Sequence, residues 1–278
     1  MSATTLKPVV KWVGGKRQLL PEISKHLPDS FGRYFEPFLG GGAVLLNLQP
    51  SHALVSDLNG ELINLYEAIR DSPEELLELF KSYPNDPDFY YELRGVDRDA
   101  DAFSRLLPVE RAARMLYLNR TGFNGMYRVN SKGHMNIPFG RYKNPSVDAE
   151  NLLAVSAYLN GDVEILNGDY RDAVVSAGAG DFVYFDPPYD PVSETSAFTA
   201  YQANGFTREN QSELAALCRE LDARGTKFML SNSNTEFVRD LYHGFNIEVV
   251  FARRSVNSVG SKRGVVEEVL VTNYGEKI

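Results

Sequence analysis

The four consecutive residues Asp186-Pro187-Pro188-Tyr189 combine groups that can hold an amine about to react. Prolines fix the backbone and lack N–H donors, so this turn leaves carbonyl oxygens as acceptors. The Asp186 carboxylate and the Pro187 carbonyl are therefore expected to accept the hydrogens of an exocyclic amine. Tyr189 offers an aromatic face on which a base can stack, which contributes about 1–3 kcal/mol. The alternative is a rigid turn that carries an acid and an aromatic residue by chance.

A second motif, Phe38-Leu39-Gly40-Gly41-Gly42, lies between an expected strand and a helical run at Ala43–Leu48. Glycines at such a turn let the backbone approach a ligand closely, and the helix N-terminus favours an anionic group. Asp57 ends the next expected strand, where a carboxylate can hold ribose hydroxyls. These features alone fit a nicotinamide cofactor, S-adenosylmethionine or a tight turn.

Short apolar runs bounded by turn residues are expected to be the strands that position both motifs. They are Tyr34–Phe38, Ala53–Ser56, Val163–Leu166, Phe182–Phe185, Lys227–Leu230, Ile247–Phe251 and Val269–Thr272. Continuous apolar runs are typical of strands buried on both faces of a parallel sheet. Asp186 directly follows one of these runs, so we expect it at the carboxyl edge of the sheet, where ligands bind in open α/β folds.

Helical patterns lie between the expected strands. One begins at Thr207, a suitable N-cap, and stops at Gly225, with an apolar stripe of Leu214, Leu217, Cys218 and Leu221. A second is expected over Gly60–Tyr83, with Leu62, Leu65, Tyr66 and Ile69 on one face. This alternation predicts an α/β fold with a doubly wound, mostly parallel, seven-stranded sheet.

The alternation is interrupted between Asp57 and about Val163, where no core strand is expected. We interpret 59–144 as an inserted, mainly helical domain, with 1–58 and 145–278 forming the other domain. Within the insert, Met126–Val129 and His134–Ile137 flank a turn sequence that ends in Gly133. This arrangement predicts a β-hairpin.

Charge is distributed unevenly along the 278 residues, although the net charge is −8. Between Arg105 and Lys143 there are eight Lys and Arg residues against Glu110 alone, and 253–263 holds four more with no acid. A basic face on an acidic body can bind phosphates locally, although such residues are often an ordinary solvated surface.

One cysteine and four scattered histidines make a disulfide impossible within the chain and a zinc site unexpected. With no apolar run long enough for a bilayer and no secretory signal, we expect a cytoplasmic protein.

Taken together, these motifs resemble the DNA adenine-N6 methyltransferases, and specifically the deoxyadenosine methylase (Dam) family of the α order, over nearly the whole chain. Besides the glycine-rich loop and the Asp-Pro-Pro-Tyr box, the resemblance rests on Lys11–Lys16, Ser56–Asn59, Leu118–Gly125, Asn136–Tyr142, Phe198–Tyr201 and Arg253–Ser255. The order of these motifs, with the cofactor loop first, the insert next and the catalytic box after it, fits the α order.

The resemblance implies S-adenosylmethionine as the cofactor. The residues that match the family's cofactor contacts are Trp12, Lys16, Phe38, Gly40, Gly42, Asp57, Asp169 and Asp186. Lys16 is expected to pair with the methionine carboxylate, Asp57 to hold the ribose, and Asp169 to accept from the cofactor's adenine amine. A lone Trp is more often a core residue and a lone Lys a surface one, but Gly14 and Gly15 beside them suggest a close backbone approach.

The resemblance also implies that the insert reads double-stranded DNA at GATC. The residues expected to contact DNA are Lys11, Phe123, Asn124, Met126, Arg128, Pro138, Arg141 and Tyr142. Arg128 suits a bidentate contact to guanine, and Phe123 can wedge between bases. Met126 stands where some members have leucine. Without the resemblance, a core Phe123 and surface arginines would be the simpler interpretation.

The expected reaction requires the target adenine to leave the stack, since a duplex hides its amine. Asp186, Pro187 and Tyr189 are expected to grip the extruded base while 190–206 closes over it. The leaving group is already cationic, so no metal is required, and no obligate protein partner is expected. Catalysis would consist mainly of orientation and of hydrogen bonds to the amine.

Other classes of protein fit the sequence less well. A catalytically silent DNA-binding protein of the same fold predicts a damaged box, whereas Asp186–Tyr189 is intact. An RNA or protein-glutamine methyltransferase is expected to carry Asn-Pro-Pro-Tyr and to lack the insert. A nicotinamide dehydrogenase leaves Gly60–Lys143 unexplained. An adenine methyltransferase with another recognition sequence stays open.

Overall fold

The computed structural model describes residues 5–192, 206–253 and 265–275. The chain forms two compact units, and each is considered by itself. The first unit comprises 1–15, 40–51 and 57–167, and the second comprises 16–39, 52–56 and 168–278. These units group residues by contact and not by role, so the functional division at 59–144 stays a proposal.

A seven-stranded sheet runs in the order β3-β2-β1-β4-β5-β7-β6. Its strands are β1 Tyr34–Glu36, β2 His52–Asp57, β3 Asp162–Asn167, β4 Phe182–Phe185, β5 Lys227–Ser233, β6 Asn246–Arg253 and β7 Val265–Thr272. β1 pairs in parallel with β2 and β4, β4 pairs in parallel with β5, and β7 pairs antiparallel with β5 and β6. The predicted strands and the mostly parallel α/β sheet are confirmed. The strand expected at Tyr34–Phe38 ends earlier, at Glu36, because Pro37 has no N–H to donate.

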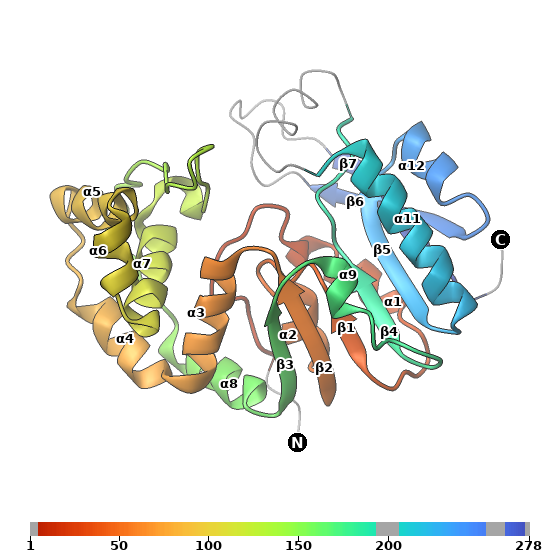
Figure 1. Cartoon of the computed structure of the whole chain (residues 1–278), viewed down its shortest axis with the longest axis horizontal. Coiled ribbons are helices and arrows are strands. Elements are labelled where there is room, and N and C mark those ends of the chain that lie inside the picture. The colour runs from red at the N-terminus through yellow and green to blue at the C-terminus, as the bar shows by residue number, and fades with distance from the viewer. Residues whose placement is uncertain (1–4, 193–205, 254–264, 276–278) are drawn as a thin grey trace. The chain divides into compact units, whose positions relative to one another are not determined.

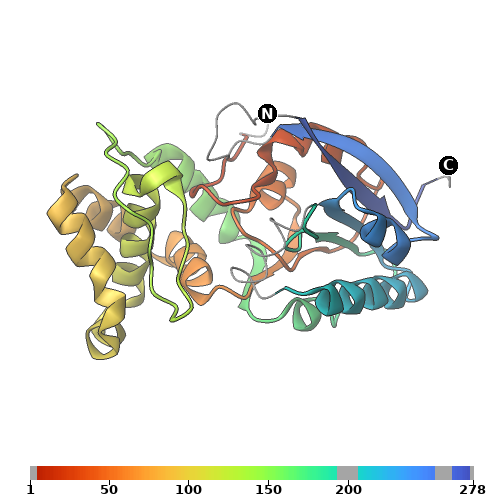
Figure 2. The same ribbon diagram turned by 90° about the horizontal axis from the view of Figure 1, so that it is seen from above.

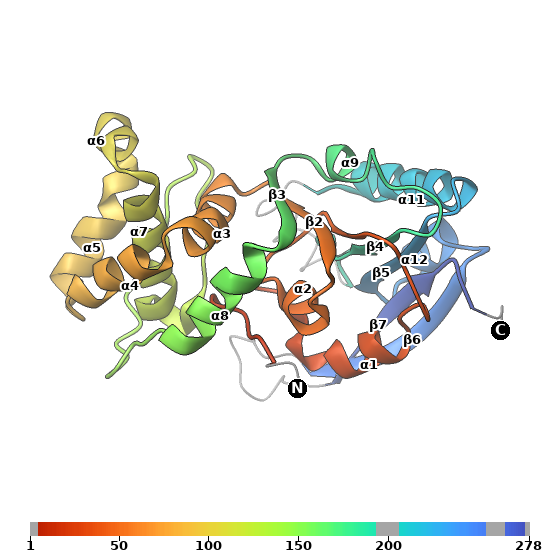
Figure 3. The same cartoon turned by 90° about the horizontal axis from the view of Figure 1, so that it is seen from below.

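Helices of the second unit flank its strands. They are η1 Lys16–Gln18, α1 Leu20–Lys25, α9 Tyr170–Ala173, α11 Arg208–Ala223 and α12 Glu236–Leu241. α11 and α1 lie on opposite faces of the strands, as a doubly wound fold requires (Figures 1 and 3). Thr207 caps α11 by accepting from the Asn210 N–H, and Leu214, Cys218 and Leu221 are buried in the core with β4, as predicted.

Helices dominate the first unit. They are α2 Ala43–Leu48, α3 Gly60–Asp71, α4 Pro73–Ser82, α5 Pro87–Gly95, η2 Val96–Arg98, α6 Ala100–Arg105, α7 Pro108–Thr121, η3 Phe123–Gly125 and α8 Ala149–Leu159. The single helix predicted over Gly60–Tyr83 is wrong, because the chain breaks at Ser72 into α3 and α4. Pro73 cannot donate a helical hydrogen bond, and it restricts Ser72, which lies at φ −145°. No helix in the described ranges is long and apolar enough to cross a membrane.

The segment after α7, yellow-green in Figure 2, runs beside the helices as an extended loop with the predicted hairpin. Val129 and Met135 form an antiparallel bridge, and the Asn130 N–H donates to the His134 carbonyl at 2.9 Å. The Asn136 N–H donates to the Arg128 carbonyl at 3.1 Å. The hairpin prediction is confirmed, with few hydrogen bonds between its two strands.

Polar side chains from α5 and η2 support this short hairpin. Tyr90 Oη and Arg94 Nη1 each donate to the Ile137 carbonyl at 2.9 Å. Asp97 accepts from the Met135 N–H at 2.7 Å and pairs with Arg114 at 2.9 Å. The Arg114 side chain is 2% exposed and Asp97 is 9% exposed, so the hairpin rests on a buried ion pair.

Burial of Arg114 also corrects the expectation of a basic face formed by all eight cations between Arg105 and Lys143. Arg111 pairs with Glu61, and Arg120 donates to the Val9 carbonyl. These three arginines lie on α7, which packs against other helices. Their guanidinium groups bind partners within the first unit. Those that stay exposed are Arg105, Arg128, Lys132, Arg141 and Lys143.

We predict that Asp97→Ala destabilises the protein by about 3–5 kcal/mol, because it leaves the Arg114 charge buried and without its carboxylate. Urea unfolding of the variant against the parent chain measures this. The exposed Asp101→Ala serves as the matched control and should change stability by less than about 0.5 kcal/mol. Equal effects of the two substitutions would contradict the structural role of the ion pair.

Candidate functional site

Asp186 stands directly after β4, whose four residues are all buried. Its Oδ1 lies 2.6 Å from Lys16 Nζ, and the two side chains are 20% and 7% exposed. Burial raises the pKa of Asp186 to about 6, although the Lys16 ammonium opposes the shift and the Glu268 carboxylate adds to it. The structure thus gives Lys16 a protein carboxylate as its partner, where the sequence analysis expected the carboxylate of a cofactor.

Tyr189 lies beside the same ion pair. Lys16 Nζ is 4.5 Å from the centroid of its ring, and its hydroxyl donates to Glu268 Oε2 at 2.8 Å. Glu268 comes from β7 and was missed by the sequence analysis. Its only signal was a Glu-Glu pair inside an otherwise apolar strand, and that pattern also fits a solvated edge.

Two buried side-chain amides, those of Gln211 and Asn232, hold the backbone at Pro188 and Asp190. Gln211 Nε2 donates to the Pro188 carbonyl at 2.7 Å, and Asn232 Oδ1 accepts from the Asp190 N–H at 3.1 Å. Asn232 Nδ2 in turn donates to Gln211 Oε1 at 3.1 Å. Gln211 and Asn232 are 2% and 0% exposed, so α11 and β5 fix the backbone on both sides of Tyr189. Neither amide was predicted from the sequence.

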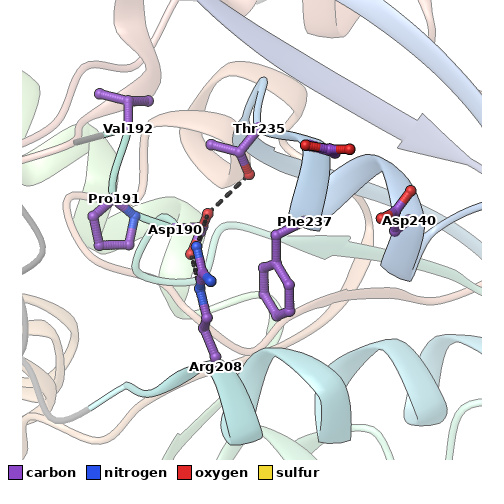
Figure 4. A pocket seen from close by; sticks show the side chains of 8 residues that line it. Asp190, Pro191, Val192, Arg208, Thr235, Phe237 and Asp240 are labelled. Carbon is purple, nitrogen blue, oxygen red and sulfur yellow. Dashed lines mark hydrogen bonds and ion pairs between the residues drawn. The ribbon is translucent and has the colours of Figure 1, made fainter. Parts of the chain in front are cut away.

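A cavity of about 450 Å³ adjoins the box in the second unit. Figure 4 shows Asp190 between Arg208 and Thr235, with the Phe237 ring beside Arg208. Arg208 Nε donates to Asp190 Oδ1 at 3.1 Å, and Thr235 Oγ1 donates to Oδ2 at 2.8 Å. The lining includes neither Asp186 nor Tyr189, so this cavity is separate from the expected base pocket.

The glycine-rich loop of the first unit is tied to Asp57. The Gly40 N–H donates to Asp57 Oδ2 and the Asn59 N–H to Oδ1, each at 2.9 Å. Burial raises the pKa of Asp57, while these backbone donors oppose the shift. The Gly40 carbonyl accepts from Tyr66 Oη at 3.1 Å. Both oxygens of Asp57, which was expected to hold ribose hydroxyls, thus accept from backbone N–H groups of the first unit.

Trp12 packs against this loop and leaves no room for a side chain at Gly40. Gly40 and Gly42 adopt φ values of +49° and +64°, a region that favours glycine. A Cβ at Gly40 would lie 2.8 Å from Trp12 Cδ1. The indole is also in contact with a second aromatic ring, since Trp12 stacks on Tyr127 at 5.8 Å between centroids. Tyr127, a neighbour of Met126, was missed by the sequence analysis.

Asp169 and Phe38 lie in the second unit with partners of their own. Asp169 caps α9 and accepts from Arg171 Nε at 2.9 Å, a contact that lowers the pKa of Asp169. Phe38 stacks on Tyr170 at 5.2 Å and meets Phe206 edge-on at 5.9 Å. Neither arrangement tests the cofactor contacts expected of these residues.

The residues expected to read DNA lie together in the first unit. Lys11 Nζ is 5.6 Å from the centroid of the Tyr142 ring, and the Phe123 N–H donates to the Pro138 carbonyl at 2.8 Å. Phe123 is 50% exposed, which excludes the simpler interpretation of a core residue. Arg128 Nε donates to Asn136 Oδ1 at 2.9 Å, and the Arg128 side chain is exposed.

The other reader residues are also accessible. Asn124 and Arg141 adopt φ values of +58° and +54°, strained for residues that carry a Cβ. Both are exposed, as is Pro138, whereas Met126 is half-buried.

Some expected motifs fall outside the described ranges. These are Phe198–Tyr201, Arg254 and Ser255, and most of the segment 190–206 that was expected to close over the base. Within the described ranges, no cluster of three or more His, Cys, Asp or Glu residues is arranged to hold a metal ion.

We predict that Gly40→Ala destabilises the protein by roughly 2–4 kcal/mol, because the new Cβ meets the Trp12 ring at a left-handed φ. Thermal and urea unfolding measure the effect. Gly178→Ala is the control, since a Cβ there has nothing within 4 Å and φ is not left-handed. A stable Gly40→Ala variant with unchanged Trp12 fluorescence would refute the proposed packing.

Comparison with known proteins identifies the family. The model of the D12 class N6 adenine-specific DNA methyltransferases matches residues 12–256. The type II methyltransferase M1.LlaDCHI of Lactococcus lactis subsp. cremoris is 48% identical over 274 residues, which cover 97% of this chain and 96% of that protein. The type II methyltransferase M.MjaIII of Methanocaldococcus jannaschii is 40% identical, with 97% and 99% covered. The DNA adenine methylase of Escherichia coli (strain K12) is 37% identical, with 94% and 93% covered. The chain therefore belongs to the D12 class of N6 adenine-specific DNA methyltransferases, as the motifs predicted.

Proposed function

We propose that this enzyme transfers the methyl group of S-adenosylmethionine to N6 of an adenine that it flips out of duplex DNA, with GATC as the recognition sequence. The observation that carries the proposal is the cluster at the end of β4. There Asp186, Lys16 and Tyr189 place an acceptor carboxylate beside an aromatic ring. A DNA substrate and the buried Cys218 thiol fit a cytoplasmic setting.

The residues matched to the cofactor have chemistry suited to it. Asp57 offers a carboxylate for ribose hydroxyls, and the Gly40–Gly42 loop leads into the N-terminus of α2. Trp12 presents a half-buried indole over that loop. When bound, S-adenosylmethionine supplies an electrophilic methyl group on a sulfonium. Lys16, Phe38, Gly42 and Asp169 complete the proposed set.

Asp186 and the Pro187 carbonyl would hold the hydrogens of the adenine amine and so aim its nitrogen. The rigid Pro-Pro turn and the buried Gln211 keep the geometry fixed, which is how orientation lowers a barrier. During transfer the sulfur–methyl bond would break as the nitrogen–carbon bond forms, and the Asp186 carboxylate would stabilise the positive charge that develops on N6 until the amine loses a proton. The Tyr189 ring would stack on the base and offset part of the cost of flipping.

The exposed hairpin supports the reading of DNA by the first unit. Arg128 projects from a hairpin anchored by a buried ion pair, which suits a side chain that must read guanine at a fixed position. Lys11, Phe123, Asn124, Met126, Pro138, Arg141 and Tyr142 are proposed to complete the contacts. GATC rests on the match of these residues to the Dam family, and another adenine-containing site is the alternative.

A catalytically silent protein that binds DNA without methylating it is not favoured. Loss of catalysis would relax the need for a buried Asp186–Lys16 pair and for the Gln211–Asn232 amides behind the box, yet both are intact. Equilibrium binding of S-adenosylmethionine, followed by methyl transfer to duplexes with and without GATC, separates these functions.

We predict that Asp186→Ala abolishes transfer of labelled methyl groups to a GATC duplex, because the amine loses its charged acceptor. DNA affinity should persist, since Asp186 is not among the proposed reader residues. Asp29→Ala, an exposed carboxylate in the same unit, is the control and should stay active. Near-normal turnover of Asp186→Ala would end the proposal.

We predict that Arg128→Ala reduces discrimination between GATC and a duplex with the guanine replaced by about 1–3 kcal/mol, which is the usual value of a bidentate contact to guanine. Competition methylation of the two duplexes measures this difference. Lys132→Ala, an exposed cation on the turn of the same hairpin, should weaken binding to both duplexes alike. Unchanged discrimination in Arg128→Ala would show that another residue reads the guanine.

A further inference from the structure

Glu268 reaches the catalytic box only through the antiparallel pairing of β7 with β5. In that register Ser233 faces Glu268 and Ser231 faces Leu270, so β7 runs back past the end of β5. β4 pairs with β5 through Phe185 and Leu230, one residue before Asp186. Because β7 runs antiparallel to β5, Glu268 lies at the same edge of the sheet as the carboxyl ends of β4 and β5.

The contact between Glu268 and Tyr189 is direct. The Tyr189 hydroxyl donates to Glu268 Oε2 at 2.8 Å, a short bond to a charged acceptor of the stronger kind. Burial and the Asp186 and Glu268 carboxylates raise the pKa of Tyr189 well above its ordinary value. The phenol therefore keeps its proton, and the hydroxyl is the donor.

This bond constrains the ring at the end remote from the backbone. Gln211 and Asn232 already fix the backbone on both sides of Tyr189, while Lys16 lies over one ring face. The side chain still has two rotatable bonds, and a hydroxyl tied to Glu268 selects one direction for the ring. A phenolic O–H prefers the ring plane, so the same bond also limits rotation of that plane.

We propose that Glu268 is a positioning residue for methyl transfer. Its carboxylate accepts from the Tyr189 hydroxyl and so fixes the orientation of the ring on which the target base stacks. The inference rests on the proposed role of Tyr189 in stacking on the base. It assigns to β7 a part in catalysis that the Asp-Pro-Pro-Tyr motif does not contain.

Glu268 also acts on Asp186 through charge. The charged and titratable groups that bear on the Asp186 carboxylate are Lys16 from η1, Glu268 from β7, and Tyr184 and Tyr189 from β4 and the turn after it. The negative charge of Glu268 raises the pKa of Asp186, and Lys16 lowers it. Neutralising Glu268 alone should therefore lower the pKa of Asp186 and extend its ionised range to more acidic pH.

The first test is a double-mutant cycle on kcat/KM for methylation of a GATC duplex. Glu268→Ala and Tyr189→Phe should each lower kcat/KM by roughly 10-fold to 100-fold, the range for one hydrogen bond to a charged group. The double variant should lose no more than either single one, because both changes remove the same bond. Losses that multiply in the double variant would overturn the proposal.

The second test is the pH profile of Glu268→Gln, which keeps an acceptor oxygen but removes the charge. It should recover most of the activity lost in Glu268→Ala. The acidic limb of its kcat/KM profile reports groups of the free enzyme. The apparent pKa of this limb should be lower than the parent value of about 6 that is expected for Asp186. Glu267→Gln is the matched control, because this neighbouring carboxylate is exposed and contacts Asn234 instead. An unmoved limb in Glu268→Gln, or an equal shift in Glu267→Gln, would contradict the proposal.

The two proposals can fail separately. If Asp186→Ala and Tyr189→Ala both keep normal turnover, the proposed reaction centre itself is wrong. If those variants are inactive while Glu268→Ala, with an unchanged unfolding midpoint, methylates at the parent rate, only the role of Glu268 is refuted.

Discussion

The ion pair between Asp186 and Lys16 is the interaction on which the site depends. A carboxylate at the end of a fully buried strand loses hydration, and each such ion costs several kcal/mol unless it is matched. The Lys16 ammonium, at 2.6 Å, supplies the match while leaving one Asp186 oxygen for another donor. Because the four residues of β4 are buried, the strand holds the Asp186 carboxylate at the carboxyl edge of the sheet, with 20% of the side chain exposed.

Buried polar side chains also fix loops within each unit. Asp57 uses both oxygens to hold backbone N–H groups of its own unit, and Gln211 spends its amide on the Pro188 carbonyl. Fixing loops in this way costs conformational entropy during folding rather than during the reaction.

The cations of the first unit are of two kinds, those that support the fold and those that remain exposed. Arg114 lies inside the unit with Asp97 and supports the hairpin, while Arg128 stands on the hairpin surface. A count of basic residues treats the two alike. Only burial distinguishes the cation that anchors the hairpin from the cation that stays exposed on its surface.

The sequence by itself determined the strands, the helix capped by Thr207 and the identity of the Asp-Pro-Pro-Tyr box, because these depend on local apolar runs and turn chemistry. It predicted one helix over Gly60–Tyr83, where the structure has two. The apolar periodicity continues through Pro73, but the helical hydrogen bonds cannot, because proline has no N–H. It was silent on Glu268, which meets Tyr189 only because β7 returns antiparallel beside β5. Contacts between residues distant in the chain depend on register and packing, and those are decided by the tertiary structure.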